Sequence, residues 1–191
     1  MQINKKEMVD SEDFFHLSDE EWTSHKNEKW GMIGEKIITQ AVKTLYKKRD
    51  GWIVDCNKFG KLSTYKMGSG MDIVVTKKST NEMEIAIEVK NFKAQKRAYG
   101  IDFVEKQVLS RRKYKSRPAL LVMTYSKLLT RKAKELLHKE GWGVLYLEHR
   151  IKCFKDWKEI YPLADKIREA IENAKKIHEE KIAKPQTKLQ I

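Results

Sequence analysis

The sequence predicts an α/β fold, a mixed β-sheet flanked by helices, and three observations support this prediction. Hydrophobic residues occupy 40% of the 191 positions, which is enough for one core. Two β-rich segments, 71–75 and 83–90, flank a short polar turn and predict a hairpin. After the hairpin, helical patterns alternate with strand patterns, and this order is typical of a mixed sheet with helices on both faces.

Each element has a local signal. Apolar residues at spacings of three and four predict a helix over 31–48, and Gly51 follows as its stop signal. A second helix is expected from Asp102 to about Arg112, with this aspartate as its N-cap and Glu105 completing a capping box. Other short apolar segments predict the remaining strands, at 52–56, 118–125 and 142–148.

Two further helices are expected later in the chain. One begins after its N-cap Thr130 and stops at Gly141. The other lies within 154–183, where apolar residues step alternately by four and three, as in a heptad repeat. This stripe consists of Leu163, Ile167, Ala170, Ala174 and Ile177. It has two interpretations: it packs on the protein's own core, or it forms the seam of a dimer.

Charge is unevenly distributed along the chain. The net charge is +13, but residues 1–28 hold three Lys and eight acids, so the remainder carries +18. The sequence therefore divides into an acidic arm (1–28), a core (29–150) and a C-terminal helical extension (151–191). A body this basic favours a polyanion as partner, most commonly nucleic acid. The alternative is a lysine-rich, heat-adapted surface, in which Glu is expected to keep pace with Lys.

Other features narrow the class of protein. Cys56 and Cys153 show neither the spacing of metal ligands nor a disulfide framework, which fits a reducing compartment. No apolar run approaches the roughly 18 residues of a membrane span. Residues 1–16 lack the apolar core of a signal peptide. We therefore expect a cytoplasmic protein.

Charged residues at the ends of two predicted strands are candidates for catalysis. Side chains alternate between the faces of a strand, so Glu84, Ala86, Glu88 and Lys90 are expected to share one face. Hairpin pairing brings Asp72, at the start of its strand, next to the strand end that carries Glu88. Two carboxylates held together repel each other and lose solvation, and a divalent cation relieves both costs.

These residue types point to metal-dependent hydrolysis of phosphate esters. Oxygen ligands favour Mg²⁺, with Mn²⁺ as the expected substitute. Lys90, beside the metal, is placed to position or deprotonate a water that attacks phosphorus. Glu35 lies on the rim of the first helix's buried face, and Gly31 and Gly34 leave room for that helix to approach. Ordinary roles are also open to these residues, in a strand-surface pair, a turn or a helix dipole.

The motifs GEKII (34–38), GSGMDIVV (68–75) and IAIEVK (85–90) resemble those of the PD-(D/E)XK nuclease superfamily, over roughly residues 30–150. Archaeal-type Holliday-junction resolvases show the closest similarity, and the tract 118–145 resembles Mrr-type restriction endonucleases as much as resolvases. The resemblance implies a restriction-endonuclease-like fold.

The resemblance also implies roles for individual residues. The metal ligands it assigns are Glu35, Asp72, Glu88 and the carbonyl of Val89. It further implies that Lys90 acts on the water and that Ser69 touches the scissile region. Gln107 falls where some members carry a supporting polar residue, but it is equally compatible with an ordinary helix surface. Met71 departs from the pattern, because proline often precedes the aspartate.

Basic residues around the predicted site are expected to hold DNA through its phosphates. Together with Ser69, they are Lys61, Lys66, Lys93, Lys96, Arg97, Arg111, Arg112, Lys113 and Lys115. Tyr65, Tyr99 and Tyr114 either stack on unpaired bases or anchor loops.

These features predict a Mg²⁺-dependent DNA endonuclease of recombination or repair that hydrolyses phosphodiester bonds. A symmetric homodimer acting on branched DNA presents two sites to two strands. Two alternatives stay open: a restriction or repair nuclease acting on duplex DNA, and a DNA-binding module of the same fold that does not catalyse. The presence of Asp72, Glu88 and Lys90 together favours catalysis.

Overall fold

The described part of the protein in the computed structural model comprises residues 27–56, 71–92, 97–111, 116–151 and 160–183. Its helices are α2 (Asn27–Leu45), α3 (Ile101–Gln107), α4 (Arg131–Lys139) and α5 (Ile160–Ala183). Its strands are β1 (Trp52–Cys56), β2 (Ile73–Lys77), β3 (Glu82–Lys90), β4 (Ala119–Thr124) and β5 (Trp142–Leu147). Short 3₁₀ turns connect some of them: η3 (Lys48–Asp50), η4 (Leu109–Arg111) and η5 (Ser126–Leu128).

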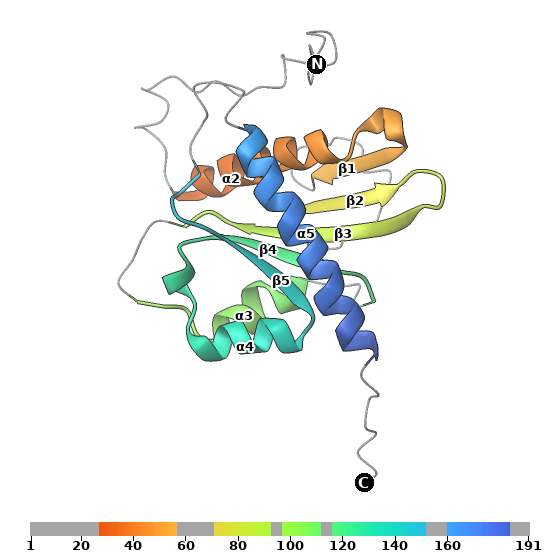
Figure 1. Ribbon diagram of the computed structural model, residues 1–191. Coiled ribbons are helices and arrows are strands. Elements are labelled where there is room, and N and C mark those ends of the chain that lie inside the picture. The colour runs from red at the N-terminus through yellow and green to blue at the C-terminus, as the bar shows by residue number, and fades with distance from the viewer. Residues whose placement is uncertain (1–26, 57–70, 93–96, 112–115, 152–159, 184–191) are drawn as a thin grey trace, which may run out of the picture.

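The five strands form one sheet in the order β1-β2-β3-β4-β5 (Figure 1). β1, β2 and β3 are antiparallel, and the short turn 78–81 joins β2 to β3, whereas β3, β4 and β5 are parallel and need helical crossovers. The helices α3 and α4 provide these crossovers. The predicted α/β class with a mixed sheet is therefore confirmed.

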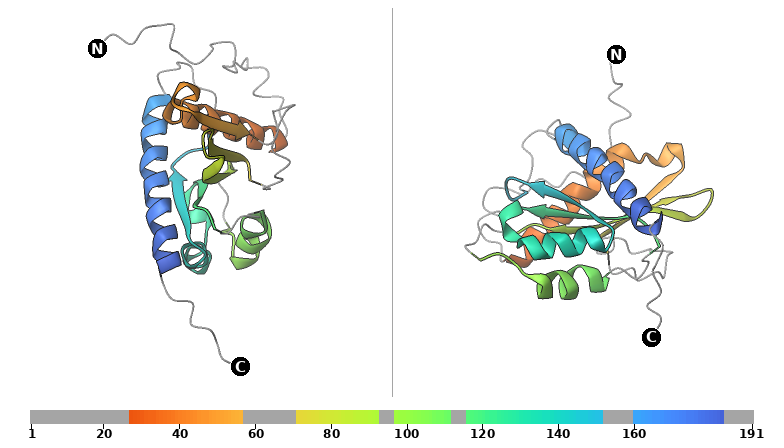
Figure 2. Two further views of the ribbon diagram at one scale, coloured as in Figure 1. Left: turned by 90° about the vertical axis from the view of Figure 1, so that its right-hand side faces the viewer. Right: turned by 60° about the horizontal axis from the view of Figure 1, so that its bottom comes forward.

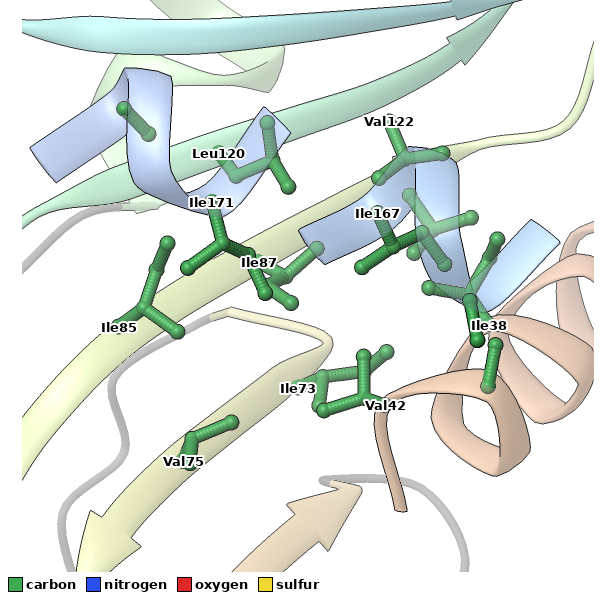
Figure 3. Close-up of a cluster of buried hydrophobic side chains, with 14 of the residues drawn as sticks. Ile38, Val42, Ile73, Val75, Ile85, Ile87, Leu120, Val122, Ile167 and Ile171 are labelled. Atoms are coloured by element: carbon green, nitrogen blue, oxygen red, sulfur yellow. The ribbon is translucent and has the colours of Figure 1, made fainter. Parts of the chain in front are cut away.

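Helices cover both faces of the sheet, as the sequence predicts. α2 and α5 pack on one face, while α3 and α4 pack on the other (Figure 2). The larger hydrophobic cluster lies on the face covered by α2 and α5. In it, aliphatic side chains from β2, β3 and β4 meet those of the two helices (Figure 3). At about 25 cal/mol per Å² of apolar surface removed from water, this burial is the main stabilising contribution.

α5 packs on the protein's own core, as in the first interpretation, but its buried face is shifted from the predicted stripe. Buried residues outside the stripe are Ile160, Ala164 and Ile171. Within the stripe, Ile167 and Ala174 are fully buried, whereas Leu163 and Ala170 are half-buried at the edge of the cluster. Ile177 is also only half-buried. α5 thus belongs to the same hydrophobic cluster as α2 and the strands. None of the described helices is both long enough and apolar enough to cross a membrane.

One predicted face assignment is wrong, because a β-bulge interrupts the β2–β3 ladder next to Val75. Glu84 is the extra residue of β3 and turns towards α5, where its carboxylate pairs with Lys175 at 2.5 Å. Burial lowers the pKa of Lys175, but hydrogen bonds to Glu84 and Glu172 outweigh this effect and hold the pKa above its ordinary value. The bulge thereby creates an ion pair between the sheet and α5.

The helix caps agree with the sequence in one case and differ in another. The Thr130 side chain accepts a hydrogen bond from the Ala133 amide, as expected of an N-cap, and Gly141 follows α4 with φ of 74°. The predicted capping box at Asp102 is wrong, because α3 begins at Ile101 and its N-cap is Gly100, without a side-chain cap. Asp102 instead lies in the first turn, where a negative charge favours the helix dipole.

Candidate active site

The start of β2 and the end of β3 meet, as the hairpin prediction requires. Ile73 pairs with Ile87, and the Val89 amide donates a 2.8 Å hydrogen bond to Oδ2 of Asp72. The Cα of Glu88 is two bonds from that amide nitrogen, so Oδ2 of Asp72 lies within about 5 Å of the Cα of Glu88. Asp72 is 5% exposed, so its carboxylate is fixed by the end of β3 and shielded from bulk water.

Glu88 and Lys90 lie side by side at the end of β3, as their spacing predicts. Glu88 is fully buried, and the Nζ of Lys90 donates to its Oε1. The Lys90 side chain keeps 15% of its surface exposed. A buried carboxylate loses solvation, and a charged amine at contact distance stabilises its ionised form. The amine is therefore held beside the carboxylate at the sheet edge.

The helix α2 brings a third carboxylate towards this edge. A Cβ added at Gly34 would lie 2.6 Å from the Asn91 Cβ, so only glycine allows α2 to lie this close to the residue that follows β3. Glu35, the next residue, is 3% exposed. The predicted close approach is thus confirmed at Gly34 but not at Gly31, where an added Cβ would meet no atom of another described segment within 4 Å.

The three acids are all buried near the carboxyl end of β3, but they do not form one compact group. Within the described ranges, no three His, Cys, Asp or Glu side chains are arranged so that they could hold a metal ion together. The donor set still fits a hard cation, because Asp72 and Glu88 offer oxygen ligands from neighbouring strand ends. Of the predicted ligands, Asp72 and Glu88 are the two that a hydrogen bond brings into proximity, since the Asp72 carboxylate accepts from the amide of the residue after Glu88.

Asn91 is a structural residue of this site that the sequence analysis did not identify. It is 5% exposed, its Nδ2 donates to the Ile151 carbonyl at 3.0 Å, and its Oδ1 accepts from the Ile151 amide at 2.9 Å. This pair of bonds joins the residue after Lys90 to the chain that follows β5. A polar residue directly after an apolar strand was the signal that could have identified it.

Thr124 and Tyr125 hold the same edge of the sheet at the end of β4. The Thr124 hydroxyl accepts from the Phe92 amide at 2.9 Å and lies 3.0 Å from the Phe92 carbonyl. Tyr125 has a φ of 59°, which is uncommon for a residue other than glycine, and its hydroxyl accepts from the Arg150 amide at 3.3 Å. Polar contacts therefore connect the chain after β3, β4 and β5.

We expect Asn91→Ala to destabilise the protein by about 2 kcal/mol, because it leaves the buried amide and carbonyl of Ile151 without their hydrogen bonds. Denaturant unfolding monitored by tryptophan fluorescence measures the change. Asn91→Asp retains an acceptor for the amide but loses the donor to the carbonyl. An unfolding free energy of Asn91→Ala equal to that of the wild type would contradict the assigned bonds.

The residues predicted to bind DNA are only partly described. Arg97 is exposed after the end of β3, and Arg111 is the last residue of η4. The others lie outside the described residues: Lys61, Lys66, Ser69, Lys93, Lys96, Arg112, Lys113 and Lys115.

Two further predicted residues have clear positions. Gln107 is exposed at the C-terminal end of α3, as expected of an ordinary helix surface. Tyr99 stacks on Phe103 with ring centroids 4.2 Å apart and lies 5.1 Å from Phe92, and its amide donates to the Leu128 carbonyl. The structure therefore supports the anchoring interpretation for Tyr99, while Tyr65 and Tyr114 lie outside the described residues.

Comparison with known proteins places this chain in no family, because no family model, curated protein or solved structure matches it.

Proposed function

We propose that this protein is a metal-dependent DNA endonuclease with a restriction-endonuclease-like fold. One observation carries the proposal: the carboxylate of Asp72 is held at the Val89 amide, next to the buried Glu88 and its partner Lys90. Two acids and an amine at the meeting ends of two strands are the residue types that hydrolysis of a phosphodiester requires. The net charge of +13 supports a polyanionic substrate.

The oxygen atoms of Asp72 and Glu88 would hold Mg²⁺, or Mn²⁺ in its place, with the carbonyl of Val89 and the carboxylate of Glu35 as further candidates. The bound ion would polarise a phosphoryl oxygen and lower the pKa of a coordinated water. The protein's own contribution is to fix these ligands. The Val89 amide orients Asp72, and the lysine amine neutralises Glu88 when the ion is absent.

Lys90 has a second role in the proposed reaction. Its Nζ lies beside Glu88 but its side chain is partly exposed, so it can reach a phosphate oxygen or a water at the sheet edge. With a cation held by Glu88, the Lys90 amine would be free to hold the attacking water or the scissile phosphate. The same amine thus serves the resting site and the reacting site.

The substrate we propose is branched DNA, cut by a homodimer whose two-fold axis presents two sites to two strands. The basic residues that the sequence predicts around the site would neutralise phosphates and carry little sequence information, which suits recognition of DNA shape. A restriction or repair nuclease acting on duplex DNA is the second candidate, and a DNA-binding module without catalysis is the third.

Incubation of the protein with labelled four-way junctions and with linear duplexes, in Mg²⁺, in Mn²⁺ and in EDTA, separates these candidates. We expect symmetric nicks near the branch in either metal ion and no product in EDTA. Duplex cutting without junction preference would favour the second candidate. Tight binding with no cleavage in either metal ion would leave the non-catalytic module.

A further inference from the structure

A concentration of positive charge lies at the other end of the sheet from the candidate active site. The turn between β2 and β3 lies against η3, because the Lys78 amide donates to the Gly51 carbonyl at 2.8 Å. Trp52, at the start of β1, pairs with Lys77 at the end of β2. The exposed basic residues of these two segments form what we call the hairpin basic patch: Lys47, Lys48, Arg49, Lys77 and Lys78.

Of the acids in the described ranges, Asp50 and Glu82 lie beside the hairpin basic patch, Glu82 as the cross-strand partner of Lys77. Asp50 is within the same turn, and its Oδ1 lies 3.9 Å from Nε of Arg49, with both side chains more than half exposed. Glu82, at the start of β3, faces Arg117 at 3.4 Å. Exposed ion pairs of this kind contribute little stability.

The backbone beneath the hairpin basic patch is well fixed. Nζ of Lys77 lies 4.9 Å from the centre of the Trp52 ring, and this ring packs edge-on against Tyr46 with centroids 5.0 Å apart. Trp52 and Tyr46 both pack against the larger hydrophobic cluster. The basic side chains of the patch therefore project from an ordered backbone. This order reduces the conformational entropy that the protein loses when the patch binds a ligand.

The hairpin basic patch is remote from the candidate active site. β3 runs nine residues from the hairpin turn to Lys90, which at about 3.3 Å per residue corresponds to roughly 25 Å. Figure 1 shows the hairpin turn and the start of β1 at one end of the sheet, and the end of β3 at the other. A group of basic residues at this distance cannot contact the phosphate that is cut.

We propose that the hairpin basic patch binds the phosphate backbone of DNA outside the cleaved region, on the flank of a duplex or on a second arm of a branched molecule. The proposal rests on the proposed function for the nature of its ligand. Five exposed lysine and arginine side chains are suited to contacts with DNA phosphates, which do not depend on the base sequence. The separation of roughly 25 Å corresponds to about seven base pairs at 3.4 Å each.

The test compares two variants that lose the same charge, in EDTA so that no cleavage occurs. The patch variant is K47Q/K48Q/R49Q/K77Q/K78Q. The control variant changes five exposed lysines on α3, α4 and α5, and is K106Q/K132Q/K139Q/K166Q/K176Q. Fluorescence anisotropy gives the Kd for a labelled four-way junction over a series of KCl concentrations, and thermal melting verifies that each variant is folded.

We expect the patch variant to bind at least about tenfold more weakly at low salt, with a log–log salt slope shallower by about 4.5 if each cation meets one phosphate. The control variant should keep the wild-type slope. The smaller variant K77Q/K78Q should lose about 2 from the slope and serves if the fivefold variant does not fold. Equal changes in the patch and control variants would overturn the proposal.

Two further measurements separate this proposal from its rivals. If the patch variant keeps its DNA affinity but loses wild-type binding to phosphatidylserine vesicles, the patch binds a membrane surface and the proposal is wrong. Cleavage is scored separately in Mg²⁺. If the wild-type protein does not cut DNA but the patch variant has a shallower salt slope, the proposed nuclease function is wrong and the proposed DNA contact of the patch stands. If the wild-type protein cuts DNA but the patch variant keeps the wild-type salt slope, only the proposed DNA contact of the patch is wrong.

Discussion

We expect Glu88→Gln to reduce the rate of DNA cleavage at least about a hundredfold, because a neutral amide can neither hold the cation nor help it to polarise the phosphate. The change is nearly isosteric. The glutamine oxygen can still accept from Nζ of Lys90, which replaces the wild-type contact. Single-turnover cleavage of a labelled junction in Mg²⁺ measures the rate, and anisotropy in EDTA verifies that DNA binding is retained.

Asp72→Asn should have a similar effect on the rate, since the asparagine oxygen can still accept from the Val89 amide while the charge is lost. Glu82→Gln is the matched control, because Glu82 lies on the same strand but at its opposite, exposed end. The control should cut at the wild-type rate. Wild-type cleavage by either Glu88→Gln or Asp72→Asn would remove that residue from the site.

The largest effect on stability is expected for Gly143→Ala, which should destabilise the protein by about 3 kcal/mol. A Cβ at Gly143 would lie 2.5 Å from the Ala174 Cβ and 2.8 Å from its Cα, so the backbone of α5 would have to move away from β5. For a domain of this size the melting temperature should fall by about 6–12 °C. Differential scanning calorimetry measures the shift.

Gly31→Ala is the matched control for Gly143→Ala, because it makes the same change in α2 at a place where the added Cβ meets no other described segment within 4 Å. It should leave the stability unchanged or raise it by up to about 1 kcal/mol through helix propensity. A second variant, Gly143→Ala with Ala174→Gly, removes the nearest atom and should recover part of the loss. Equal stabilities of Gly143→Ala and the wild type would refute the close packing of α5 on β5.

Much of the fold could be predicted because local signals and tertiary packing agree. The segment 52–56 was predicted as a strand with the bounds that the structure has, and Thr130 caps α4 as its hydroxyl and position suggested. The capping box at Asp102 failed because a glycine immediately outside a helix serves as N-cap with no distinctive sequence signal. The bulge at Glu84 depends on pairing with β2 and on Lys175 in α5, both distant in the sequence.

In the candidate site too, local sequence patterns were enough to predict some positions, whereas others depend on tertiary contacts. Strand alternation and the hairpin were sufficient to place Glu88 beside Lys90 and Asp72 at the adjacent strand end. The position of Glu35 depends on how α2 docks, which a helical wheel does not specify, and the structure does not bring it into one group with the other acids. Asn91 was missed because its partner, Ile151, is 60 residues away along the chain.

The packing of α5 against α2 has a consequence for how the protein is made. The last described helix supplies one wall of the larger hydrophobic cluster, which also contains side chains from α2, the first described helix. During synthesis, the apolar face formed by Ile73, Ile87 and Leu120 stays open to water until α5 has left the ribosome. Nascent chains that stall before this point would therefore expose a hydrophobic surface and would need chaperones to prevent aggregation.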